Sequence, residues 1–143
     1  MTYYKGLEEP LQESQAKGVK DELQGTVVLI TGASSGLGKE TAKTLIEVGY
    51  TVYAAARHVD KMEDLQRLGG IPLKMDVTQD EDMVAAVQQI ERDRGGVDIL
   101  INNAGFGLYG PVEEIPMDNA QYQFDVNLFG MARLTQLVLP YMR

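Results

Sequence analysis

The sequence predicts an α/β fold with a doubly wound parallel sheet, and three observations indicate this class. Short apolar runs suited to strands alternate with segments of helical periodicity between residues 26 and 141. The apolar runs are continuous, as expected for strands that helices cover on both faces. The first run, 26–30, leads directly into a glycine-rich turn and then a helical segment, which is the start of a right-handed crossover.

The predicted elements follow one another in a regular order. Strands are expected at 26–30, 50–56, 71–75 and 97–101, helices at 39–48, 60–68, 80–92 and 117–141, and a Gly- and Pro-rich loop at 102–116. Gly49 is expected to cap the first helix, and Thr78 with Glu81 to form a capping box for the third. Ligands of such sheets bind outside the carboxyl ends of the strands, so the loops that follow the four strands should carry the site.

Residues 1–24 are polar, and we interpret them as an N-terminal extension with at most a short helix and no chemistry. Residues 25–143 are long enough for one domain with one core. The beginning of the chain lacks the apolar segment of a signal peptide, which favours a cytoplasmic protein. No apolar run approaches the ~18 residues of a membrane span.

Composition excludes several classes of function. The net charge is −8 and the pI about 4.6, which argues against nucleic acid as the main partner because phosphate backbones favour a basic face. The sequence has no cysteine and one histidine, His58, which we expect on a surface loop. Neither a zinc cluster nor a Ser-His-Asp triad can be assembled around that residue, so no metal site is predicted.

The glycine turn carries the first functional signal. Gly32, Gly36 and Gly38 lie between the first strand and its helix, in the arrangement of a Rossmann-type dinucleotide-binding crossover. One glycine makes the turn, one admits the pyrophosphate close to the backbone, and one lets the helix pack on the strand. Free N–H groups at the helix N-terminus favour the phosphate charge. The cofactor residues predicted here are Gly32, Ser34, Ser35, Gly36, Leu37 and Gly38.

The cofactor preference depends on the end of the second strand. NAD-binding domains place an acid about 20 residues past the glycines to bond the ribose 2′-hydroxyl. Here Ala56 and Arg57 occupy that place. An acid would repel a 2′-phosphate, whereas arginine pairs with it, so NADP(H) is predicted over NAD(H), with Arg57 and Ser34 on the phosphate. The alternative is that Arg57 is a solvated loop residue.

The motif Thr-Gly-x-x-x-Gly-x-Gly at 31–38, together with three later segments, resembles the short-chain dehydrogenase/reductase family. The later segments are Asp76-Val77, Asn102-Asn103-Ala104-Gly105 and Asn127, and the likeness covers residues 26–143. The stretches 53–57 and 105–111 look most like the branch with 17β-hydroxysteroid-dehydrogenase-like and retinol-dehydrogenase-like members. The resemblance implies a sheet of order 3-2-1-4 and hydride transfer between NADP(H) and a carbonyl or alcohol, and the likeness to that branch implies a hydrophobic substrate. One departure is Ser35, where many NADP-preferring relatives carry a basic residue.

The resemblance also assigns roles to later residues. It places Asp76 and Val77 at the adenine and Val126 at the cofactor. The backbone at the ribose, kept thin by small residues, is that of Asn103, Ala104 and Gly105. Asn102 is expected to make local hydrogen bonds to the sheet. It gives Asn127 a catalytic role, at a helix kink that holds a water linked to the catalytic lysine. The alternatives are a turn or capping aspartate at position 76, and at position 127 a buried asparagine that its neighbours satisfy.

Residues 1–143 contain no Tyr-x-x-x-Lys, the pair that supplies the proton in this family. The family's serine would close a fifth strand. We therefore expect the NADP(H)-binding half of such an enzyme, truncated before these residues and by itself inactive; the alternatives are a non-catalytic nucleotide-binding module and an inactive fragment. The open edge of the fourth strand and an apolar face on helix 117–141 predict a homo-oligomer or a fragment of a longer product.

Overall fold

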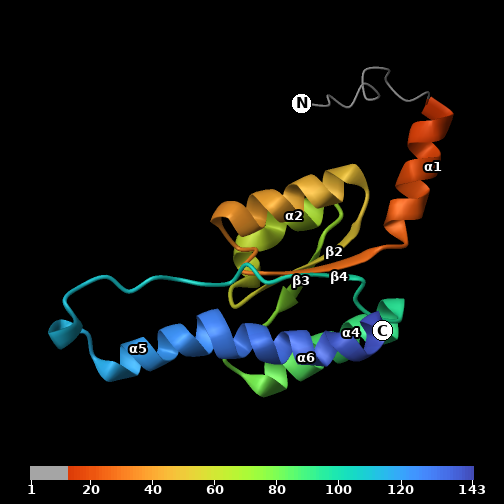
Figure 1. Ribbon diagram of the computed structural model, residues 1–143. Helices are drawn as coiled ribbons and strands as arrows, with labels where there is room; N and C mark the ends of the chain where they lie inside the picture. Colours follow the sequence, from red (N-terminus) through yellow and green to blue (C-terminus); the bar gives the residue numbers. More distant parts are fainter. Residues whose placement is uncertain (1–12) are drawn as a thin grey trace, which may run out of the picture.

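The computed structural model describes residues 13–143 (Figure 1). Its centre is a four-stranded parallel sheet of β1 (Val27–Thr31), β2 (Thr51–Ala56), β3 (Ile71–Lys74) and β4 (Ile99–Ile101). The strand order is β3-β2-β1-β4, because β1 pairs with both β2 and β4, and β2 pairs with β3. The predicted fold class and strand order are confirmed.

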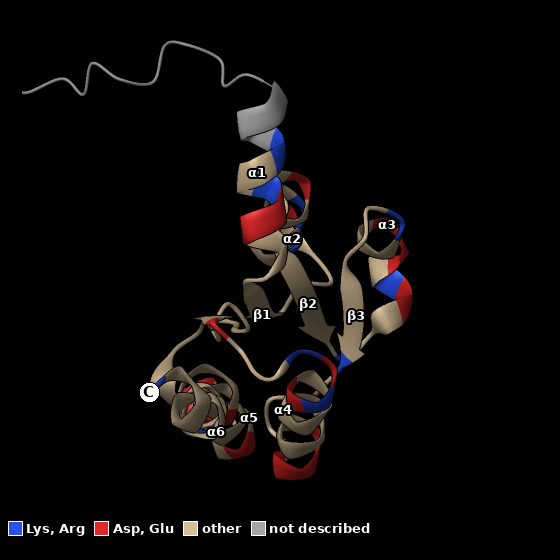
Figure 2. Cartoon of the chain, turned by 90° about the vertical axis from the view of Figure 1, so that its right-hand side faces the viewer, with Lys and Arg blue, Asp and Glu red and all other residues tan. Residues whose placement is uncertain are grey.

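Helices cover both faces of the sheet. The helices are α1 (Glu13–Gln24), α2 (Gly36–Val48), α3 (Glu63–Arg67), α4 (Asp80–Arg94), α5 (Met117–Phe124) and α6 (Met131–Met142). Short 3-10 turns occupy η1 (Val59–Met62) and η2 (Val112–Glu114), and η3 (Asp125–Gly130) is a π-helix. Figures 1 and 2 show α2 and α3 on one side of the sheet and α4 and α6 on the other. None of the helices in residues 13–143 is long and apolar enough to cross a membrane.

The core divides into two layers, one on each face of the sheet. Val28, Ile30 and Val52 belong to the layer under α2 and α3. Leu29 and Tyr53 belong to the layer that α4 and α6 cover. All five residues of β1 are buried, which explains why residues 27–30 form a continuous apolar run rather than an alternating pattern.

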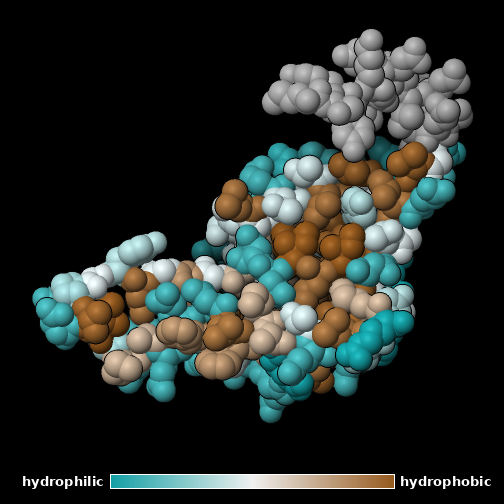
Figure 3. Space-filling view, in the orientation of Figure 1, coloured by the Kyte–Doolittle hydropathy of each residue, from teal (hydrophilic) through white to brown (hydrophobic). Residues whose placement is uncertain are grey.

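The edge at β4 is less covered than the centre. Within the described residues β4 pairs with β1 alone, and Ile99 is 38% exposed whereas Leu29 is fully buried. Apolar surface gathers in the middle of the face shown in Figure 3 and again along the arm formed by α5. On α5 and η3 the exposed apolar side chains include Phe124 and Phe129.

The predicted single helix at 117–141 is wrong in one respect, because it consists of three segments. The π-helix η3 lies between α5 and α6 and contains Asn127. A Cβ on Gly130 would collide with the carbonyl oxygen of Val77, so the helix approaches the loop after β3 very closely there. This tertiary contact leaves no trace in the periodicity of the helix.

The capping box predicted for α4 is also wrong. The N-cap is Gln79, without a side-chain cap, and the Thr78 hydroxyl donates to Oδ1 of Asp76 at 2.7 Å instead. Gly49 does cap α2, with φ +121°. A short helix is present in the N-terminal extension, as expected, while residues 1–12 lie outside the described residues.

Two ion pairs connect neighbouring helices. Lys39 Nζ of α2 lies 3.1 Å from Asp64 Oδ2 of α3, and Arg133 Nε of α6 lies 2.5 Å from Asp80 Oδ1 of α4. The hydrogen bond from each cation lowers the pKa of its aspartate below the usual value. Both pairs are solvent-exposed, so they orient the helices more than they stabilise them.

Candidate cofactor site

A cleft of about 710 Å³ opens at the carboxyl end of the sheet. That volume falls within the range of small-molecule and cofactor sites, roughly 300–1,000 Å³. The loops after all four strands line it, together with α5 and η3. Of the predicted residues, the cleft brings together Gly32, Ser34, Ser35, Leu37, Gly38, Arg57, Asp76, Val77, Asn103, Ala104, Gly105 and Val126. Gly36 and Asn127 are not among its lining residues.

The three glycines of the turn differ in their surroundings. Gly32 has φ +67°, and a Cβ there would lie 2.9 Å from the Cα of Ala104. A Cβ on Gly38 would collide with the Gly32 carbonyl oxygen and with Asn103 Nδ2. Gly36 has φ +55° and open space around it. Gly32 and Gly38 therefore let the turn close on itself, while Gly36 provides the backbone reversal that starts α2.

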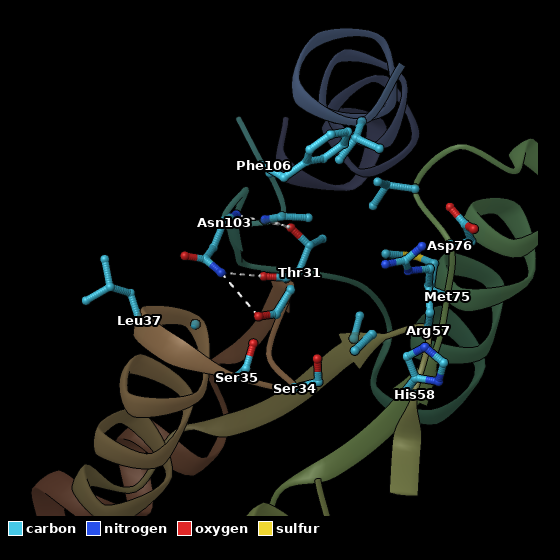
Figure 4. Close-up of a pocket in the computed structure, with 18 of the residues that line it drawn as sticks. Thr31, Ser34, Ser35, Leu37, Arg57, His58, Met75, Asp76, Asn103 and Phe106 are labelled. Atoms are coloured by element: carbon cyan, nitrogen blue, oxygen red, sulfur yellow. Dashed lines mark hydrogen bonds between the residues drawn. The ribbon is translucent and has the colours of Figure 1, made fainter. Parts of the chain in front are cut away.

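The first turn of α2 faces the cleft with donors still available. Its N-cap residue, Ser35, makes no side-chain cap hydrogen bond. The first N–H groups of a helix have no partner within the helix, so those of α2 can bind an anion. Ser34, Ser35 and Leu37 lie on this side of the cleft in Figure 4.

Asn103 and Thr31 join the glycine turn to the loop after β4. Thr31 Oγ1 accepts hydrogen bonds from the backbone N–H groups of Asn103 at 3.1 Å and Ala104 at 2.9 Å. The Asn103 side chain donates to the carbonyl oxygens of Thr31 at 3.1 Å and Gly32 at 3.3 Å (Figure 4). Sequence reasoning assigned position 103 only a backbone role and missed this side-chain bridge. Asn102, expected to bond locally, donates instead to Thr135 of α6.

The opposite side of the cleft carries Arg57, His58, Met75 and Asp76, which Figure 4 shows close together. Asp76 Oδ1 accepts from both the N–H and the hydroxyl of Thr78, so the turn role considered as an alternative is present. Only Oδ1 makes those bonds. The second oxygen, Oδ2, accepts no hydrogen bond from the described residues and can accept one from a ligand in the cleft.

Arg57 is exposed but has a protein partner across the cleft. Its Nη1 donates to the hydroxyl of Tyr122 on α5 at 3.0 Å. The ring of Tyr122 in turn packs against Phe106, with centroids 5.5 Å apart. Neither Tyr122 nor Phe106 was singled out from the sequence, because one aromatic residue on a helix and one in a loop give no signal of their contact.

Asn127 holds the loop after β4 on the helix. Its Nδ2 donates to the carbonyl oxygen of Phe106 at 2.7 Å, and its Oδ1 accepts from the Phe106 N–H at 3.0 Å. Four residues earlier, Gln123 accepts from the N–H of Leu108. The side chain of Asn127 is exposed rather than buried, so the alternative of a buried asparagine is wrong, although its amide is satisfied by a neighbour.

Asn127→Ala is expected to release this loop while leaving the sheet intact. Two hydrogen bonds to the backbone of one residue, Phe106, are lost, at a cost of about 1–2 kcal/mol given that both are exposed. Amide hydrogen exchange should accelerate at Phe106 and its neighbours. Asn119→Ala on α5 is the matched control, since its side chain makes no hydrogen bond with the described residues. Equal exchange at Phe106 in the two variants would contradict the role of Asn127.

A parallel sheet of order 3-2-1-4, with a glycine turn at β1 and a cleft over its carboxyl edge, defines a nucleotide-binding α/β domain of the Rossmann type. The family model described as short chain dehydrogenase matches residues 26–143, and the chain belongs to this family.

Curated relatives and solved structures agree with that assignment. The chain is 40% identical over 121 residues to a 3-ketodihydrosphingosine reductase of Bacteroides thetaiotaomicron, covering 85% of this chain and 44% of the relative. It is 40% identical over 126 residues to human retinol dehydrogenase 8, and the match covers 81% of this chain and 40% of the relative. The chain thus spans about half the length of the curated relatives it matches, or less.

Two solved structures are similar in fold. A short-chain dehydrogenase from Streptomyces avermitilis matches with a TM-score of 0.79 and 35% identity, over 82% of this chain and 44% of that one. A metagenomic short-chain oxidoreductase in complex with NADP matches with a TM-score of 0.80 and 28% identity, over 84% of this chain and 57% of that one.

Proposed function

We propose that the cleft binds NADP(H), and that the chain is the cofactor-binding part of an oxidoreductase that transfers a hydride between NADP(H) and a carbonyl or alcohol. The observation that carries this proposal is the position of Arg57, at the end of β2 where an NAD-specific domain would have an acid. It lies across the same cleft from the glycine turn at the start of α2.

Each part of the cofactor has candidate partners in the cleft. The N–H groups at the start of α2 would bind the pyrophosphate. Asp76 Oδ2 would accept from the adenine amino group, and Val77 with Val126 would pack beside the ring. The backbone of 103–105 would lie along the nicotinamide-side ribose. Ser34 and Arg57 would bind the 2′-phosphate, as the charge of the guanidinium favours.

The bound cofactor would supply or accept the hydride, and the residues of this chain would bind and orient it. Asn127 would act by positioning, through its two bonds to Phe106. Residues 1–143 hold no Tyr-x-x-x-Lys. We therefore expect these residues alone to bind cofactor without turnover, which is also the behaviour of the alternative, a nucleotide-binding module.

The likeness to a retinol dehydrogenase and to a 3-ketodihydrosphingosine reductase supports a hydrophobic carbonyl or alcohol as the substrate class. A homo-oligomer is proposed from two surfaces, the β4 edge and the apolar face of α5 and η3, on which Phe124 is 57% and Phe129 60% exposed.

Arg57→Ala is expected to weaken NADPH binding about 10- to 100-fold, the effect of losing a charge-assisted hydrogen bond of roughly 1.5–3 kcal/mol. NADH carries no 2′-phosphate, so its dissociation constant should change less than about threefold. Isothermal titration calorimetry of both cofactors on the full chain measures the difference. Arg67→Ala on α3 is the control, because that arginine pairs with Glu63 and does not line the cleft. Equal losses for both cofactors would refute the NADP(H) assignment.

A further inference from the structure

We propose that Tyr122 is a specificity-determining residue for the 2′-phosphate, acting both by holding the guanidinium of Arg57 in place and by donating its own hydroxyl proton. The inference rests on the proposed NADP(H) site and adds a residue of α5, Tyr122, to the two already proposed for the 2′-phosphate, Ser34 and Arg57.

The geometry joins two distant parts of the chain across the cleft. Arg57 follows β2 and Tyr122 lies on α5, 65 positions later, yet the guanidinium Nη1 and the phenolic oxygen are 3.0 Å apart. Both residues line the cleft. A ligand group bound beside Arg57 therefore also lies within reach of the Tyr122 hydroxyl.

The donor count at this pair leaves room for an anion. A guanidinium has five N–H donors, and this pair uses one of them. The phenol accepts that bond and keeps its own proton to donate. An incoming phosphate oxygen can receive a charged hydrogen bond from Arg57 and a neutral one from Tyr122, whereas an uncharged ribose hydroxyl offers much less to either donor.

The tyrosine is fixed more firmly than the arginine. Its ring packs on Phe106 at 5.5 Å between centroids, with the planes tilted by 38°. The backbone of Phe106 is itself held by both groups of the Asn127 amide. An exposed arginine loses side-chain freedom when it binds phosphate, and a partner that already orients it reduces that loss. Tyr122 thus preorganises Arg57 for a phosphate at this end of the cleft.

Tyr122→Phe removes the hydroxyl and keeps the ring on Phe106. We expect the dissociation constants of NADPH and of adenosine 2′,5′-bisphosphate to rise about 10- to 20-fold, at the lower end of the range for loss of one hydrogen bond to a charged group. Those of NADH and AMP should change less than about twofold. The measurement is calorimetry on the full chain, with the thermal midpoint of each variant as a check of folding. In an Arg57→Ala background the same change should have a smaller effect, because the guanidinium that the tyrosine orients is gone and only the direct hydrogen bond from its hydroxyl to the phosphate remains to be lost.

Tyr109→Phe is the matched control, since Tyr109 lies in the loop between β4 and η2, is 95% exposed and does not line the cleft. Equal weakening of NADPH and NADH by Tyr122→Phe would show a structural role and overturn the inference. No effect of Tyr122→Phe, beside a selective effect of Arg57→Ala, would overturn it while the proposed function stands. No selective effect of Arg57→Ala would instead defeat the NADP(H) proposal itself.

Discussion

Gly38→Ala is expected to abolish measurable NADPH binding and to lower the free energy of unfolding by about 2–3 kcal/mol, the range of overpacking in a well-packed site. The added Cβ would collide with the carbonyl oxygen of Gly32 and with Asn103 Nδ2. The Gly32 oxygen is a backbone atom, and Asn103 Nδ2 is held by its hydrogen bonds to the carbonyl oxygens of Thr31 and Gly32. Neither atom can withdraw without opening the turn that faces the cleft.

Urea unfolding and NADPH titration on the same preparations measure the two effects. Gly18→Ala is the matched control, because Gly18 is also a glycine within a helix, α1, and a Cβ there would meet nothing within 4 Å. That control should leave binding unchanged and stabilise by up to about 1 kcal/mol, the helix-propensity difference between the two residues. Normal cofactor affinity in Gly38→Ala would contradict the close packing of the turn.

Thr31→Val is expected to lower the free energy of unfolding by about 2–4 kcal/mol. The substitution keeps the shape of the side chain but removes Oγ1, the acceptor for the N–H groups of Asn103 and Ala104. Thr31 is 2% exposed, so water cannot readily replace the lost acceptor. Each donor left without a partner costs about 1–3 kcal/mol.

Amide exchange at positions 103 and 104 should accelerate together with the loss of stability, since both N–H groups lose the same acceptor. The control is Thr44→Val in α2, where an exposed hydroxyl donates to the carbonyl oxygen of Glu40. That change should stay within about 0.5 kcal/mol, as for most surface substitutions. A small effect at Thr31, equal to that at Thr44, would show that its two hydrogen bonds contribute little.

Much of the fold was predictable because it is encoded locally. The continuous apolar runs of β1 and β2 indicate strands buried on both faces, and the parallel order followed from their alternation with helices. Gly32, Gly36 and Gly49 mark backbone with positive φ, which only glycine adopts readily. The contents of the cleft were largely predictable for the same reason, since the predicted residues directly follow strand ends that meet at one edge.

Most of the features that sequence reasoning missed depend on partners far away along the chain. The bond from Asn102 goes to Thr135, 33 positions away, and that from Arg57 to Tyr122 spans 65. The Thr78 hydroxyl could cap a helix or bond to Asp76, and both options look the same in the sequence. The resemblance implied a kink at Asn127, but the sequence did not indicate that a π-helix occupies 125–130 or that Gly130 lies against the carbonyl of Val77.

By itself, the sequence determined the order of strands and helices, the glycine turn and the basic residue at the end of β2. These depend on periodicity and on backbone preferences that act within a few residues. Only the tertiary structure decided which polar groups meet across the cleft, namely Thr31 with the loop after β4, Asn127 with Phe106, and Tyr122 with Arg57. A hydrogen bond needs its two atoms within about 3 Å, and spacing along the chain does not fix such a distance between separate elements.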